Sequence, residues 1–140
     1  MTAFTKFYCF VEDLANGLHD LGSDALFVAL TNTQPLLTDS IFTDITEIAG
    51  GTGYTAGGEA AAVVSGSQAL GLYRLILADP TTWTAAGGAM GPLRWAVLYN
   101  SIPMLQPLIG FWDRGSGTTI QAGGTFKLDL SNVNGVLTLQ

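Results

Sequence analysis

The chain has one histidine and one cysteine, so any catalytic site built on an imidazole or a thiol must use His19 or Cys9. His19 stands beside Asp20 at the expected end of a helix, where the helix dipole favours a partly protonated imidazole. We therefore predict that His19 is an exposed capping residue. Cys9 lies within the helical pattern, between Tyr8 and Phe10, and is predicted to be a half-buried apolar side chain rather than a nucleophile.

Carboxylates could run a glycosidase if two of them met across a cleft with separated pKa values. Nothing in the sequence pairs them, and Asp39 and Asp79 lie in Thr/Pro contexts typical of side-chain bonds to nearby backbone. One or two loop carboxylates could collect a cation at a subunit interface, but the regular acid spacing of a calcium loop is absent. We expect no enzyme activity, no cofactor and no dedicated metal site. The candidate acids are Asp39, Asp44, Glu47, Asp79 and Asp113.

Two loop regions are candidates for contact with a partner. The segment AGGTGYTAGG (49–58) has neither the glycine spacing of a nucleotide-binding loop nor its lysine, and we interpret it as a flexible or tightly turning loop. Trp83 lies in a Thr/Gly-rich loop and is predicted to be an exposed aromatic, whereas Trp95 and Trp112 are predicted to lie in the core. An exposed Trp83 leaves open a sugar-binding module that recognises the host surface. The candidate contacts are Gly51, Gly53, Tyr54, Gly57, Trp83 and Met90.

The composition is short of charge. Only 11% of the 140 residues are charged, against roughly 25% in an ordinary soluble domain. Because charge normally keeps monomers apart, part of this surface is expected to be covered in a homo-oligomer or a larger assembly. The net charge of −6 and the scattered basic residues argue against a nucleic-acid partner. No apolar run is long enough to span a membrane, and the amino terminus lacks the pattern of a secretory signal, so we expect synthesis in the cytoplasm.

One helix is expected, at the start of the chain. From Phe4 to Leu18 apolar residues recur at helical spacing, and the glycines from Gly17 to Gly22 supply a stop. The apolar stripe is predicted to face a sheet, with docking on a partner subunit as the alternative. We assign residues 1–22 to this helix and its turn.

Residues 23–140 have the short β-branched and aromatic runs of a β region. Where the residues between alternating apolar positions are apolar too, as with Ala96 and Leu98, a partner could cover the second face. The segment Ile41 to Ile48 fits either a helix or a bent strand, with strand favoured. Asn134-Gly135 predicts a closing hairpin. The expected strands are Ala25 to Thr31, Ala60 to Ser65, Gly71 to Leu77, Leu93 to Tyr99, Leu108 to Trp112, Thr125 to Leu130 and Val136 to Leu139.

These elements predict one domain over residues 1–140. The fold class is mainly β: a jelly-roll-like β-sandwich with one N-terminal amphipathic α-helix packed on or beside it. No linker, charge block or long internal repeat divides the chain.

Five segments occur in an order that resembles a family of small virion proteins of tailed bacteriophages: ALFVALTNTQP, DITEIAGGTGYTAGGE, ADPTTWTAAGGAMGPLRWAVLYN, PLIGFWDRGSG and GGTFKLDLSNVNGVLTLQ. The resemblance implies a structural component of the particle with no catalytic residues. A capsid decoration or cement protein that binds the major capsid protein is the first expectation, and a neck, tail or fibre-associated protein is the alternative. The expected location is the virion, after synthesis in the host bacterial cytoplasm.

Overall fold

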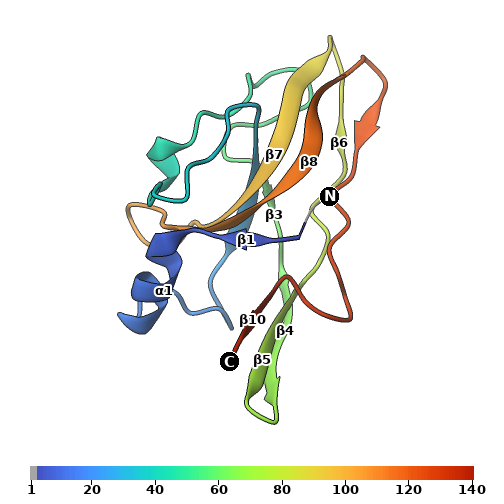
Figure 1. The fold of residues 1–140 in the computed structure, drawn as a ribbon. Helices are drawn as coiled ribbons and strands as arrows, with labels where there is room; N and C mark the ends of the chain where they lie inside the picture. The colour runs from blue at the N-terminus through green and yellow to red at the C-terminus, as the bar shows by residue number, and fades with distance from the viewer. Residues whose placement is uncertain (1–2) are drawn as a thin grey trace.

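The computed structural model describes residues 3–140, and Met1 and Thr2 lie outside the described residues. The fold is mainly β, with antiparallel sheets and one short helix, α1 (Tyr8–Ala15) (Figure 1). The largest sheet has the order β1 (Thr5–Lys6), β8 (Leu108–Ile120), β7 (Met90–Asn100), β2 (Leu26–Thr31) and β3 (Glu59–Ala60). A second sheet has the order β10 (Leu137–Leu139), β5 (Leu72–Leu77) and β4 (Val63–Ala69), and β6 (Trp83–Thr84) pairs with β9 (Thr125–Phe126).

The main core lies where these three sheets meet. It takes Val28, Leu30 and Leu98 from the largest sheet, Leu75 from the second, and Phe126 from the third. All five side chains are buried. Side chains that fill one shared core hold the sheets together as a single hydrophobic unit.

The opposite face of β7 and β2 carries a second, smaller core. Val97 and Tyr99 of β7 pack there with Phe7 and with the partly buried Phe42 and Ile45. Side chains of the chain itself therefore cover this face of β7 and β2, for which the sequence had suggested a partner as the cover. Strict alternation along β7 would put Leu93 on the same face as Val97, but register shifts in the β7–β8 ladder put Leu93 in the main core.

The predicted helix from Phe4 to Leu18 is shorter at both ends in the structure. At its start, β1 pairs with β8, so residues 5–6 are extended. At its end, Gly17 has a φ of 81° and donates to the Leu14 carbonyl at 3.2 Å, while Leu18 N–H reaches the Asp13 carbonyl at 2.9 Å. These two bonds form a Schellman motif, which confirms the predicted glycine stop.

The predicted inward stripe of the helix is partly wrong. Of the residues at the predicted helical spacing, Phe7 is buried but Tyr8 and Val11 are exposed, and Phe10, which is not at that spacing, is buried. Of the 8 residues in α1, only Phe10 is buried, so the helix presents one narrow side to the core and the wide apolar stripe is not all covered.

Two further local predictions are wrong. The favoured strand at Ile41 to Ile48 is a short 3₁₀ helix, Phe42–Asp44, because the Asp44 carboxylate accepts the Ser40 and Ile41 N–H groups and curls the backbone. The closing hairpin does not form: β9 pairs with β6, and β10 pairs with β5. Gly135 does have the expected positive φ, but it turns the chain onto β5 rather than back onto β9.

Candidate interaction surface

The two loops predicted to contact a partner lie side by side. The Thr52 carbonyl accepts the Ala86 N–H at 3.4 Å, and the Thr52 hydroxyl donates to the Ala89 carbonyl at 2.9 Å. Gly53, with a φ of 101°, lies so close to Thr84 that a Cβ would overlap its carbonyl. The structure thus brings the segment 49–58 and the segment 83–90 together at one end of the molecule.

Tyr54 fastens the glycine-rich loop to the sheet. Its hydroxyl donates to the Glu47 carboxylate and accepts the Leu30 N–H of β2 at 3.2 Å. The same carboxylate accepts the Gly57 N–H at 2.7 Å, and the Tyr99 hydroxyl donates to the Gly57 carbonyl at 2.6 Å. These bonds favour the tightly turning interpretation of this loop over the flexible one.

Trp83 is not the exposed aromatic that the sequence predicted. Only 1% of its surface is accessible, and its ring stacks on Phe126 with the centroids 5.7 Å apart. The pairing of β6 with β9 places Trp83 opposite Phe126 and turns it into the main core. Tyr54 and Met90 are buried too, while Gly51 and Gly53 are exposed. A sugar could not stack on Trp83 without opening the core. Trp95 and Trp112 are buried, as predicted.

All five candidate acids accept hydrogen bonds from the backbone. Each accepts a hydrogen bond from a main-chain N–H of the chain itself: Asp39 from Leu36, Asp44 from Ser40 and Ile41, Glu47 from Gly57, Asp79 from Leu130, and Asp113 from Gly115. The predicted bond to nearby backbone is confirmed for Asp39, but it is wrong for Asp79, which bonds the distant Leu130 N–H. A carboxylate held in this way fixes a loop, because it satisfies donors that the turn leaves unpaired.

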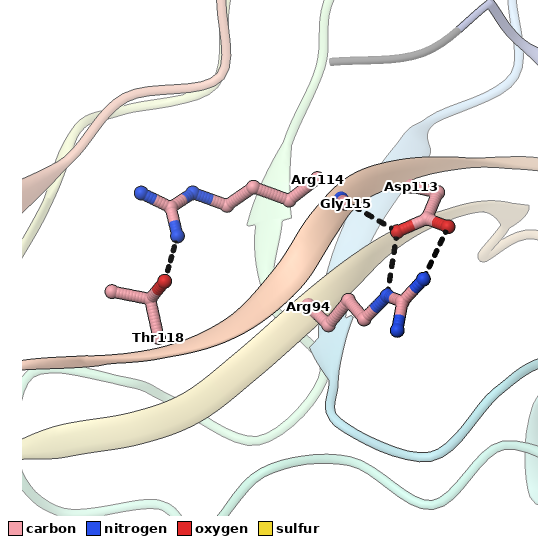
Figure 2. A network of polar contacts seen from close by, with 5 residues as sticks. All are labelled: Arg94, Asp113, Arg114, Gly115 and Thr118. Atoms are coloured by element: carbon pink, nitrogen blue, oxygen red, sulfur yellow. Dashed lines mark hydrogen bonds and ion pairs between the residues drawn. The ribbon is translucent and has the colours of Figure 1, made fainter.

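Asp113 shows the arrangement most fully (Figure 2). Its two oxygens accept the Arg94 Nε and Nη2 groups at 2.8 and 3.0 Å, and one of them also accepts the Gly115 N–H at 2.8 Å. The Arg94 guanidinium first, and then the Gly115 N–H, hold the pKa of Asp113 below its ordinary value. Arg114 reaches away to Thr118. The bidentate pair joins β7 to β8 and keeps Asp113 ionised.

His19 is buried, not the exposed cap that the sequence predicted. It is 6% accessible and packs against Phe10, with the ring centroids 5.3 Å apart. Its Nδ1 accepts from the Asn100 amide at 3.1 Å, and the same amide donates to Asp24 at 2.6 Å. Burial lowers the pKa of His19, against the opposing effect of Asp13 and Asp24. The Schellman motif turns the chain back toward the core, and this carries His19 inside.

A mainly apolar depression of about 340 Å³ lies between α1 and the turn that joins β7 to β8. Leu18 lines it from the segment after α1, and Met104 and Leu105 line it from the turn. Met104 is 96% exposed and Leu105 is 64% exposed. We call this feature the α1–turn depression; its other lining residues are Cys9, Asp13, Ser40, Ile41, Pro103 and Pro107. Large apolar side chains gathered around a hollow mark a surface suited to protein contact.

Cys9 lies at the base of the α1–turn depression. Its Sγ is within 3.6 to 3.7 Å of the carbonyl oxygens of Asp39, Ser40 and Leu108, and it is half-buried, as predicted. Burial first, and then the neighbouring Asp13 carboxylate, raise the pKa of the Cys9 thiol to about 11. A thiol with this pKa is protonated at neutral pH and is a weak nucleophile.

The rim of the depression is acidic. Asp13 is the charged residue that lines it, and no lysine or arginine is among the lining residues. Asp44 is not a lining residue, but its charge also raises the pKa of the Cys9 thiol. Sequence reasoning missed Leu18, Met104 and Leu105 as candidate contacts. The signal that could have indicated them is the apolar content of the segment IPMLQP (102–107). Turns between strands are normally polar, so apolar residues there suggest a contact surface.

Within residues 3–140, no group of three or more His, Cys, Asp or Glu side chains is arranged to hold a metal ion. In the same part of the chain, no helix has the length and apolar character needed to cross a membrane. Compared with protein-family models, curated proteins and solved structures, the chain matches none of them.

Proposed function

We propose that this protein is a non-enzymatic structural subunit of a tailed-bacteriophage particle that binds a neighbouring subunit through the α1–turn depression. The observation that carries the docking role is the depression itself, in which Met104 and Leu105 hold apolar side chains in solvent. Burying such side chains in a partner is favourable by roughly 25 cal/mol per Å² of apolar surface. The phage assignment rests on the order of the five sequence segments.

The proposed partner is the major capsid protein, with the subunit acting as a head decoration or cement protein in the virion. A neck, tail or fibre subunit is the alternative partner within the same class. The Asp13 carboxylate in the lining favours a partner surface whose apolar side chains are flanked by Lys or Arg. We also propose that the fold is a jelly-roll-like β-sandwich, and the core that the three sheets share supports this.

The chemistry of the side chains supports a role without catalysis. The Cys9 thiol is protonated at neutral pH, and His19 is buried with Asn100 rather than placed beside a nucleophile. The five candidate acids are bound to backbone N–H groups. His19 and the five acids thus make structural contacts within the protein.

Binding to particles that lack the protein tests the proposal. Wild-type protein is expected to sediment with such particles, and the double variant Met104→Asp/Leu105→Asp is expected to lose binding at least about tenfold, because two charges would enter the apolar contact. Val133→Asp is the matched control, since Val133 is equally exposed but lies outside the depression, and it should bind as the wild type does.

A density map of the reconstituted particle then identifies the neighbour. Density for this chain on the head shell, with the α1–turn depression against the major capsid protein, is the expected result. Full binding by the double variant would contradict the docking site, and failure of the wild-type protein to bind head, neck or tail would contradict the virion role.

A further inference from the structure

The hairpin of β4 and β5 projects from the body of the molecule (Figure 1). In β4, the residues from Val64 to Ala69 are all exposed. β4 is the outer strand of its sheet, and among residues 3–140 no strand pairs with its outer edge. Alternate N–H and C=O groups along such an edge point outward and can pair with another strand.

This edge lacks the usual protection against pairing. Its sequence, VVSGSQA, contains no charged residue and no proline. One irregularity in the ladder falls between Val63 and Ser65, which leaves Ser65 to Ala69 in regular register with β5. A regular, uncharged and exposed edge is a template for β-augmentation.

The edge is also self-complementary. In an antiparallel pair of two β4 strands centred on Gly66, each Ser65 would face Ser67 of the other copy, and Gly66 would face itself. No like charges would meet, although the chain as a whole has a net charge of −6. Identical patches that face each other in this way are what a twofold dimer interface requires.

The tip of the β4–β5 hairpin also favours a second copy of the chain as the partner. Leu70 is fully exposed and has a φ of 52°, a left-handed conformation that a leucine rarely adopts. In the pairing centred on Gly66, this tip would lie beside the start of the other β4, near Ala62 and Val63. Those residues line a depression of about 320 Å³ that also includes Leu26. The register therefore brings an exposed leucine to a hollow whose lining includes the apolar side chains of Ala62, Val63 and Leu26.

From these observations we infer that two copies of the chain associate through antiparallel pairing of their β4 edges, with Leu70 of each copy at the hollow beside Val63 of the other. The pairing joins two three-stranded sheets into one. The inference stands apart from the proposed function, since the α1–turn depression contains no residue of β4 or β5.

Sedimentation equilibrium tests the inference. The wild-type protein is expected to show a dimer mass that dissociates on dilution. The double variant Ser65→Lys/Ser67→Lys places lysines opposite one another, and it should weaken the dimer at least about tenfold, because directly opposed like charges destabilise a strand pair. Ser116→Lys/Gln121→Lys is the matched control, since both residues are exposed and lie outside β4, and its dimer should be unchanged.

Cross-linking tests the register in a background with Cys9→Ser. Opposed residues in an antiparallel pair have Cα atoms about 4.5–5.5 Å apart, within disulfide reach. Ser65→Cys protein mixed with Ser67→Cys protein should form a disulfide-linked pair on mild oxidation, whereas Ser65→Cys mixed with Ser116→Cys should not. A monomeric wild-type protein, a dimer that survives the two lysines, or equal cross-linking in both mixtures would overturn the inference.

Discussion

At the scale of single residues, polar side chains tie the loops to the sheets. Tyr54 is the clearest case, because one hydroxyl joins Glu47 to the Leu30 N–H inside the molecule. The sequence suggested that Tyr54 meets a partner, since it lies among glycines. Its burial follows from the contact of the loop with β2 and β6, which no local pattern reveals.

Tyr54→Phe is expected to lower the free energy of unfolding by about 1–3 kcal/mol, because the Leu30 N–H stays buried and loses its acceptor. Urea denaturation followed by circular dichroism measures the change. Tyr8→Phe is the control, since the Tyr8 side chain is exposed and its loss should cost almost nothing. Equal stability of Tyr54→Phe and wild type would contradict the anchoring role.

His19 gives the protein a pH-dependent stability. Because the folded pKa is lowered from 6.5, the unfolded chain takes up a proton first as the pH falls. The contribution of neutral His19 is fully present above pH 6.5 and is lost as the pH drops from 6.5 toward the folded pKa. Urea midpoints between roughly pH 7.5 and pH 5.5 should decline in the wild type and decline less in His19→Gln. The same slope in both proteins would show that another group titrates.

At the scale of elements, alternation predicted the longer strands well. β7 and β8 contain the segments expected of them, and β2 and β5 each begin one residue later than predicted. The two-residue strands β1 and β6 were not predicted, since they exist only through pairing with distant segments. The predicted strand from Thr125 to Leu130 is too long, because only Thr125–Phe126 finds a partner, as β9. The α1–turn depression was missed for the same reason. It forms only because the fold brings Leu18 and Met104, which are distant in sequence, to the same place.

Substitution by alanine should destabilise the protein more at Gly58 than at Gly51, although both glycines lie in one loop. Gly58 has a φ of 80°, and a Cβ there would overlap the Val28 carbonyl of β2, whereas a Cβ on Gly51, with a φ of 104°, meets nothing. Both substitutions carry the left-handed penalty of about 1–2 kcal/mol. Gly58→Ala should cost about 1–3 kcal/mol more, because the loop must move away from the strand. Thermal melts compare the two variants, and equal losses would contradict the close approach.

At the scale of the whole molecule, one core joins all three sheets. Trp83 of β6, Leu75 of β5 and Leu98 of β7 belong to the same buried cluster. Removing any sheet would expose the apolar side chains of the other two, so partial unfolding is costly.

The protein is therefore expected to unfold in one cooperative transition. Tryptophan fluorescence reports on the largest sheet and on β6, while far-ultraviolet circular dichroism reports on the backbone as a whole. The two signals should give the same urea midpoint. Midpoints that separate would show that one sheet melts on its own.

The amino-terminal segment is fastened at both ends: β1 lies in the largest sheet, and His19 and Asp24 are bonded to Asn100. Phe7 and Phe10 between them are buried. A protease should therefore find little to cut between residues 5 and 24, despite their distance in sequence from the central strands. A shortened chain that begins at residue 23 would lack two core aromatics and an edge strand, so the β region is not expected to be an independent folding unit.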